Sequence, residues 1–248
     1  MTFSYSRLIA FDSCKYKWLM KYILDIPKIS GDFFSSYGAF MHDILAKFHM
    51  GEGNNETLSL YYLDNYFSRV VGKPQRTSTA INYFNQGYDA VCGLKPCPHE
   101  VLGVEREVHW VLGGRNYVGY VDLILRSKDG IIIQDHKNRD LKPRSGKAKP
   151  TKTDIELSQY LRQLYLYSIP IYEIYGDYPA YLCLNCYRTG VQIRERFDMQ
   201  ALEETKQWAI AKANEIERND DWSPNMDYFG CRYLCDTKHE CEYFQAAK

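Results

Sequence analysis

Hydrophobic positions recur at helical spacing through the first ninety residues of the chain. In residues 4–25 they predict one amphipathic helix, opened by a serine. Three more helical patterns follow at 36–50, 56–71 and 77–91, separated by segments that contain glycine or proline. The first part of the chain is therefore expected to be helical.

The hydrophobic pattern changes to that of strands after residue 100. Residues 101–112, 115–126 and 131–136 are rich in Val, Ile and Leu. The pairs Gly113-Gly114 and Asp129-Gly130 supply the turns between them. This pattern predicts an antiparallel meander of three strands.

The rest of the chain mixes helical and strand patterns. The expected elements are a helix at 156–175, strands at Tyr181–Tyr187 and Val191–Phe197, a helix at 199–217 and an irregular tail from Trp222. Pro170 should kink or end the first of these helices, because proline lacks the N–H that a helix interior needs. Helices alternating with strands predict an α/β (α+β) fold.

The composition is that of an ordinary globular protein. Hydrophobic residues make up 45% of the 248 residues and charged residues 25%, with a net charge of zero. No stretch approaches the roughly 18 consecutive apolar residues of a membrane-spanning helix, and the first residues lack the pattern of a secretory leader. We therefore expect a cytoplasmic protein with no membrane partner, in a reducing compartment where cysteines ligate metals or clusters.

Local charge differs from the overall balance in one segment. From Lys137 to Lys152 the chain has seven Lys or Arg residues and one acid, Asp140. Such a segment is either a solvated loop or a loop that contacts the phosphates of a nucleic acid. The candidate DNA-binding residues are Arg139, Lys142, Arg144, Lys147, Lys149 and Lys152.

Two carboxylates and an ammonium group are predicted to share one face of the second hairpin. Asp135 and Lys137 project together because they are two residues apart in a strand. A two-residue turn at 128–129 places Asp122 opposite Asp135, and a turn at 129–130 places it opposite Lys137. The three groups form either a salt bridge at a sheet edge or a site for Mg²⁺ or Mn²⁺ beside a phosphate.

Two helical segments around this hairpin carry further polar residues. The first contains Gly38-Ala-Phe-Met-His42-Asp-Ile-Leu45, and the second contains Gln163-Leu-Tyr-Leu-Tyr167. Alone, each is also typical of an ordinary core or surface helix. With Gly119-Tyr-Val-Asp122 and Asp135-His-Lys137, they resemble the RecB-like nucleases of the PD-(D/E)XK superfamily, in which G-x-x-x-H-x-x-L, G-x-(I/V)-D, (D/E)-x-K and Q-h-x-x-Y motifs occur in this order.

The resemblance implies a restriction-endonuclease-like core and a role for each motif position. The ligands of a Mg²⁺ or Mn²⁺ ion would be His42, Asp122, Asp135 and the carbonyl oxygen of His136. Lys137 would be the catalytic lysine, and Gln163 and Tyr167 would orient DNA or that lysine. The resemblance also implies a central mixed sheet flanked by helices within a single nuclease domain over 1–248. Its parts would be a helical N-terminal part at 1–95, a catalytic core at 96–200, and a C-terminal helix with a cysteine-rich tail at 201–248 that packs back on the first helix.

Cys183 and Cys186 form a CxxC motif inside a predicted strand. Residues three apart in a strand point to opposite faces, so we expect two buried structural thiols rather than a shared metal. Cys92 and Cys97 flank a turn and are also interpreted as structural.

The irregular tail holds three more cysteines that could converge on one metal: Cys231, Cys235 and Cys241. With Cys14 they resemble the iron–sulfur branch of the superfamily, seen in AddB-like nucleases and the CRISPR-associated Cas-four exonucleases, where one early and three late cysteines hold a [4Fe–4S] cluster. The chain departs from that branch in its C-x₃-C spacing and in Lys15, where proline is common. Zinc held by the tail cysteines with Cys14 or His239, and free thiols, are the alternatives.

The hypothesis that follows is a metal-dependent DNA exonuclease of recombination or repair, acting on single-stranded or end-containing DNA. The alternatives are a DNA-binding or processing module with a zinc-stapled fold, and a structure-specific endonuclease. The chain has no G-x-x-x-x-G-K-[ST] motif of a helicase. It would therefore act alone or beside a separate helicase, annealing or CRISPR adaptation partner.

Overall fold

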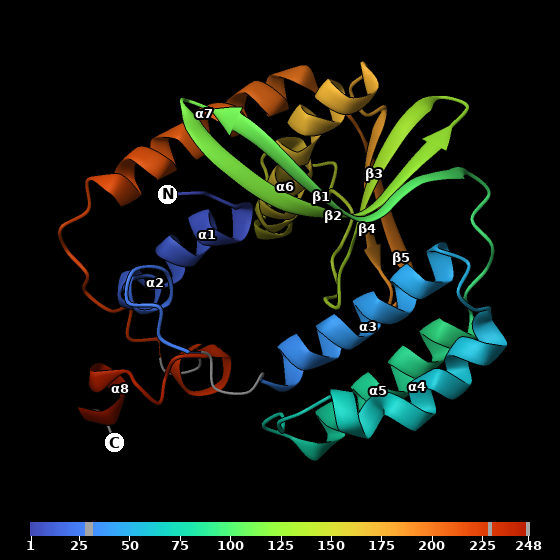
Figure 1. Ribbon diagram of the computed structural model, residues 1–248, viewed down its shortest axis with the longest axis horizontal. Coiled ribbons are helices and arrows are strands. Elements are labelled where there is room, and N and C mark those ends of the chain that lie inside the picture. The colour runs from blue at the N-terminus through green and yellow to red at the C-terminus, as the bar shows by residue number, and fades with distance from the viewer. Residues whose placement is uncertain (28–31, 228–229, 247–248) are drawn as a thin grey trace.

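The computed structural model describes residues 1–27, 32–227 and 230–246 (Figure 1). The helices of this part of the chain are α1 (Tyr5–Ser13), α2 (Lys15–Tyr22), α3 (Phe33–His49), α4 (Asn55–Arg69), α5 (Thr77–Cys92), α6 (Lys152–Tyr175), α7 (Met199–Glu217), a π-helical turn η1 (Gly230–Leu234) and α8 (Glu242–Ala246). Its strands are β1 (Glu100–Leu112), β2 (Arg115–Ser127), β3 (Gly130–His136), β4 (Tyr181–Cys186) and β5 (Val191–Arg196).

The five strands form one mixed sheet in the order β1-β2-β3-β4-β5. Strands β1, β2 and β3 pair antiparallel, which confirms the predicted meander. Strand β4 pairs parallel with β3, and α6 makes the crossover that a parallel pair requires. The predicted α/β class with a mixed sheet flanked by helices is confirmed.

The prediction of one helix over 4–25 is wrong, because the chain leaves helical geometry at Cys14. This residue is extended, with φ −168° and ψ 113°, so α1 ends before it and α2 starts after it. Its Sγ accepts a hydrogen bond from the N–H of Lys17 at 3.4 Å and caps α2. The break leaves Cys14 between two helices rather than on the face of one.

The expectation that Pro170 could end a helix is also wrong. Helix α6 continues through it and ends before Gly176, which has a left-handed φ of 79°. Pro170 and the neighbouring Ile171 are buried. Burial of this helix in the core offsets the hydrogen bond that proline cannot make.

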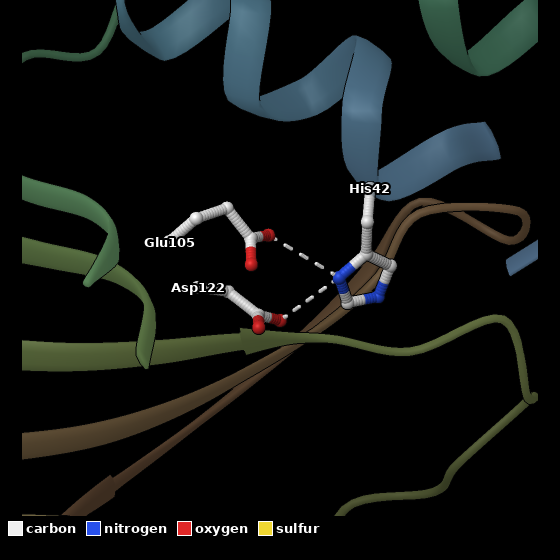
Figure 2. Close-up of side chains that lie close together, drawn as sticks. All are labelled: His42, Glu105 and Asp122. Atoms are coloured by element: carbon white, nitrogen blue, oxygen red, sulfur yellow. Dashed lines mark ion pairs between the residues drawn. The ribbon is translucent and has the colours of Figure 1, made fainter. Parts of the chain in front are cut away.

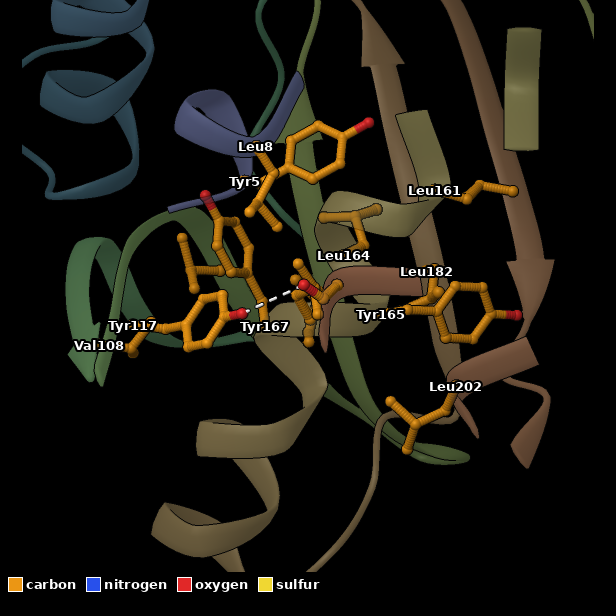
Figure 3. Close-up of a cluster of buried hydrophobic side chains, with 14 of the residues drawn as sticks. Tyr5, Leu8, Val108, Tyr117, Leu161, Leu164, Tyr165, Tyr167, Leu182 and Leu202 are labelled. Carbon is orange, nitrogen blue, oxygen red and sulfur yellow. Dashed lines mark hydrogen bonds between the residues drawn. The ribbon is translucent and has the colours of Figure 1, made fainter. Parts of the chain in front are cut away.

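The main core lies between the sheet and the helices α1, α6 and α7 (Figure 3). Tyr5 and Leu8 of α1, Leu164 of α6 and Leu202 of α7 all belong to it. A second cluster joins α3 to the α4–α5 hairpin, which lies on the side of α3 away from the sheet (Figure 1). Helix α3 is thus fixed between two cores, beside the sheet.

The two ends of the described chain lie side by side. The Trp18 ring of α2 stacks on that of Trp222 at 5.6 Å, and Lys17 pairs with Asp236 of the tail at 2.9 Å. Figure 1 shows α8 close to α2. In the described residues, no helix is both long enough and apolar enough to cross a membrane.

Candidate active site

A cleft of about 940 Å³ lies between α1, α3, α6 and the neighbouring strands β2 and β3. It is lined by all the side chains predicted for metal binding and catalysis, namely His42, Asp122, Asp135, Lys137, Gln163 and Tyr167. The fold therefore brings residues separated by 125 positions in the chain to one surface.

The β2–β3 turn decides how the two aspartates are placed. Ser127 pairs with Gly130 and Leu123 with Gln134, so Asp122 and Asp135 form the next pair in this register. This is the first of the two predicted registers. Only 7% of Asp122 and 2% of Asp135 is exposed, so two carboxylates are held out of water near one another.

His42 reaches this pair from α3 (Figure 2). Its Nδ1 lies 3.6 Å from Oδ2 of Asp122 and 3.5 Å from Oε1 of Glu105. Its Nε2 lies 3.1 Å from the carbonyl oxygen of His136. The imidazole therefore stands between carboxylates of two strands and a main-chain oxygen of a third.

Glu105 is the site residue that the sequence reasoning missed. It lies on β1 with a left-handed φ of 46°, a conformation that costs about 1–3 kcal/mol in a residue other than glycine. The pairs on either side of it place it opposite Asp122. A signal was present in the sequence, because counting back from the Gly113-Gly114 turn gives the same pairing.

Ligand atoms of His42, Glu105 and Asp122 all lie within 4.8 Å of one another. Two carboxylates and an imidazole at this spacing can hold a divalent cation, and oxygen ligands suit Mg²⁺ or Mn²⁺. Asp135 stands outside this group, with Oδ2 2.6 Å from Nζ of Lys137. The structure thus groups two of the predicted ligands with Glu105 and places Asp135 against the lysine.

A chain of polar contacts links Lys137 to α6. Lys137 donates to Oε1 of Gln163 at 3.1 Å, and Nε2 of Gln163 donates to the hydroxyl of Tyr167 at 2.9 Å. The Tyr167 ring lies so close to Gly119 that a Cβ there would stand 2.3 Å from the ring. Gly119 of the strand motif therefore makes room for Tyr167 of the helix motif.

Burial and charge shift the pKa values of these groups. Burial, with the neighbouring Asp135, raises the pKa of Asp122 to about 7, and His42 opposes that shift. Burial opposes the charge of the Lys137 ammonium, but Asp135 and Asp122 raise its pKa overall. A cation near Asp122 would relieve the repulsion between the carboxylates, which is the electrostatic condition of a metal site.

The main chain of His136 faces the candidate metal site. Its N–H donates to Oδ2 of Asp122 at 2.6 Å, and its carbonyl oxygen faces His42. Its ring stacks on that of His49, lies edge-on to the His42 ring at 5.8 Å between centres, and has its Nδ1 3.0 Å from Nδ2 of Asn185. Burial holds the pKa of this imidazole well below its usual value, so the ring is neutral.

The basic segment after β3 is largely exposed and anchored by the buried Leu141. Of the six candidate DNA-binding residues only Arg139 lines the cleft. Arg144 instead pairs with Glu195 at 2.8 Å. Lys142, Lys147, Lys149 and Lys152 are exposed beyond the cleft.

The cysteines differ in their surroundings, and Cys92, interpreted as structural, is exposed. Cys183 and Cys186 are buried in different clusters on opposite faces of β4, which confirms that their thiols diverge. All the cysteines are free. Four of them line one small cavity between α2 and the tail: Cys14, Cys231, Cys235 and Cys241.

Comparison with known proteins assigns this arrangement to a family. The model of the PD-(D/E)XK nuclease superfamily matches residues 2–242. The fold is similar to that of a crystal structure from Eubacterium rectale, described as a proposed exonuclease, with 13% identity and a TM-score of 0.59 over 96% of this chain and 87% of that one.

A crystal structure of SSO0001 aligns at 15% identity over 92% of this chain and 94% of that one, with a TM-score of 0.34 that supports no argument. No curated protein matches the chain. The family assignment therefore rests on the match to the family model, and the similar crystal structure supports the fold.

Proposed function

Because the chain belongs to the PD-(D/E)XK nuclease superfamily, we propose that it is a metal-dependent exonuclease that hydrolyses phosphodiester bonds of single-stranded or end-containing DNA. The observation that carries the proposal is the group formed by the buried Asp122 with His42 and Glu105, beside the Asp135–Lys137 pair. A salt bridge at a sheet edge, the alternative for this hairpin, would need neither a third carboxylate nor a histidine from α3.

The donor atoms fit Mg²⁺ or Mn²⁺, because they are carboxylate oxygens and one imidazole nitrogen. The raised pKa of Asp122 is consistent with a site that a cation would complete. Such an ion would supply positive charge to polarise a phosphate and a water molecule. His42, Asp122 and Glu105 would hold it, with Asp135 and the carbonyl oxygen of His136 as the further ligands implied by the family resemblance.

Lys137 is the residue placed to assist the reaction. Hydrolysis adds water to phosphorus, breaks the bond to the leaving sugar oxygen, and develops negative charge on the phosphate oxygens. The Lys137 ammonium, held by Asp135 and Gln163, can offset that charge and orient the water. Tyr167 fixes Gln163 and acts on the reaction only through it.

An end-label assay tests the proposal. Wild-type protein with Mn²⁺ should shorten 5′- and 3′-labelled single strands and leave circular single-stranded DNA intact. Lys137→Ala should lose at least about a hundredfold in rate, the size of one preorganised electrostatic contact. Lys128→Ala, which changes an exposed lysine in the turn of the same hairpin, should match the wild type.

The outcomes separate the competing functions. Cutting of circular DNA would indicate a structure-specific endonuclease. Binding of DNA without cleavage would indicate a binding or processing module. Equal activity of wild type and Lys137→Ala would contradict the assignment of the site.

We further propose that Cys14, Cys231, Cys235 and Cys241 hold a [4Fe–4S] cluster, as in the iron–sulfur branch of the superfamily. Their shared cavity supports this, as does Lys238 on its wall, whose charge would offset that of thiolates. No three of these described sulfur atoms lie within 4.8 Å of one another. In a tetrahedral zinc site with Zn–S bonds of about 2.3 Å, the sulfur atoms would lie about 3.8 Å from one another, which is closer than this.

The cluster would act as a structural staple, outside the catalytic cleft. His239, the alternative zinc ligand, is not among the described residues that line the cavity. With no helicase motif in the chain, unwinding of duplex ends would come from a separate helicase, annealing or CRISPR adaptation partner.

A further inference from the structure

The charged groups that line the active-site cleft are almost all paired. Three basic side chains of the cleft have acidic partners. These pairs are His42 with Asp122 at 3.6 Å, Lys137 with Asp135 at 2.6 Å, and Arg139 with Glu156 at 3.6 Å. The cleft's remaining acid, Asp12, pairs with Lys212 at 2.6 Å. This pattern leaves one cation of the cleft, Arg162, without a carboxylate partner in the part of the chain that the structure describes.

Arg162 is nevertheless held in place. Its guanidinium lies 4.9 Å from the centre of the Trp208 ring, so α6 and α7 each supply one member of the pair. The ring of Tyr5 packs against the ring of Trp208, with 6.0 Å between their centres. A stacked guanidinium loses little further freedom when it binds, and it keeps its N–H donors at the ring edge.

The location of Arg162 ties it to the catalytic group. It precedes Gln163, which binds Lys137, and both residues line the same cleft. A half-buried arginine that has no anionic partner, beside a site for phosphodiester hydrolysis, is arranged for a phosphate. Arginine suits this task because its planar donors can bind two oxygens of one phosphate.

We propose that Arg162, held against Trp208, binds a phosphate of the DNA strand next to the phosphate that is cut. This inference rests on the proposed nuclease function and adds a substrate contact outside the basic segment and the four motifs. Arg162 is the binding residue. Trp208 is a positioning residue, which acts through Arg162.

Binding without cleavage tests the contact. The affinity of a fluorescent single-stranded oligonucleotide is measured in EDTA over a range of salt concentrations, for the wild type, Arg162→Ala and Arg162→Lys. Loss of one phosphate contact should reduce the slope of log affinity against log salt by about 0.7. Arg162→Lys should keep that slope but bind more weakly, because lysine lacks the planar fork.

Arg218→Ala is the matched control. It removes one positive charge at the end of α7, outside the residues that line the cleft. Its slope should equal that of the wild type. An Arg162→Ala slope equal to that of Arg218→Ala would overturn the proposal.

The role of Trp208 has its own readout. Trp208→Phe keeps an aromatic surface for the guanidinium and should bind DNA nearly as the wild type does. Trp208→Ala should weaken binding in the wild type but have little further effect in an Arg162→Ala background. Additive losses in the double variant would show that Trp208 does not act through Arg162.

Oligonucleotides with one neutral methylphosphonate locate the phosphate. One position should weaken binding of the wild type and leave Arg162→Ala unaffected. Equal sensitivity of both proteins at every position would contradict the contact. Failure of the wild type to cleave DNA with Mn²⁺ would instead count against the proposed function, so the two failures are distinguishable.

Discussion

The charge of Asp122 depends on its burial and on its neighbours. Burial and the nearby Asp135 favour its protonated form, while His42 and the main-chain N–H of His136 favour the carboxylate. Its pKa of about 7 lets small changes nearby alter its charge near neutral pH. A divalent cation would bind to the deprotonated form, and Glu105 adds a second carboxylate to that binding.

Glu105→Gln should therefore weaken Mn²⁺ binding by about tenfold or more, because it removes a charged ligand from a group of three. Isothermal titration of metal-free protein with Mn²⁺ measures the change. Glu107→Gln is the control, since this exposed side chain on the same strand bonds to His109 and Tyr120. Equal Mn²⁺ affinity of the two variants would show that Glu105 is not a ligand.

At the scale of elements, the site depends on how β2 packs against α6. Gly119 of β2 lies under the ring of Tyr167, and Tyr167 bonds to Gln163, which in turn binds Lys137. The strand motif and the helix motif are therefore one structural unit. A change in either should displace the other.

Gly119→Ala should lower the free energy of unfolding by about 1–3 kcal/mol, because the added methyl overlaps the Tyr167 ring. It should also reduce the cleavage rate, since the displaced ring no longer holds Gln163. Gly38→Ala is the control for stability, because a Cβ there would meet only Asn138 at 3.5 Å. Chemical unfolding compares the two variants, and the end-label assay compares Gly119→Ala with the wild type. Equal stability of the two variants would contradict the packing argument.

The start of α6 gives a pH-dependent prediction. The hydroxyl and N–H groups of Thr151 and Ser145 donate to the Asp154 carboxylate, and these bonds lower its pKa. The stabilisation is thus fully present above the unfolded pKa of about 3.9 and is lost as the pH falls toward the lower folded value.

Asp154→Asn should be less stable than the wild type at neutral pH, with a difference that shrinks as the pH falls below about 4. Urea unfolding of both proteins from neutral pH down to about pH 3 measures it. A difference that stays constant over this range would exclude the carboxylate as its source.

At the scale of the whole molecule, the two ends of the chain are joined beside the nuclease core. Cys14 lies near the start and the other three cysteines of the cavity lie in the tail. A group bound by all four would close a loop of more than two hundred residues, which favours the folded state by restricting the unfolded chain.

Cys231→Ser should therefore lower the iron content and the visible absorbance of the purified protein and reduce its Tm. Cys92→Ser, which changes an exposed thiol at the end of α5, should affect none of the three. Elemental analysis and thermal unfolding provide the measurements. Zinc in place of iron in the wild type would favour the alternative of a zinc staple.

The sequence alone determined most of the elements and much of the candidate site. Segments rich in Val, Ile and Leu, with turns at Gly113-Gly114 and Asp129-Gly130, predicted the meander. The ordered motifs identified the polar side chains that line the cleft from α3, β2, β3 and α6, but not Glu105 of β1. Strand geometry also predicted that Cys183 and Cys186 diverge.

Tertiary structure decided what depends on distances between elements. Glu105 joins the metal group only because β1 pairs with β2 and its backbone adopts a left-handed conformation. In the part of the chain that the structure describes, Arg162 of α6 has no carboxylate partner and stacks on Trp208 of α7, a contact between distant elements. Local patterns specify which face a side chain takes, whereas register and packing between distant elements specify which groups meet.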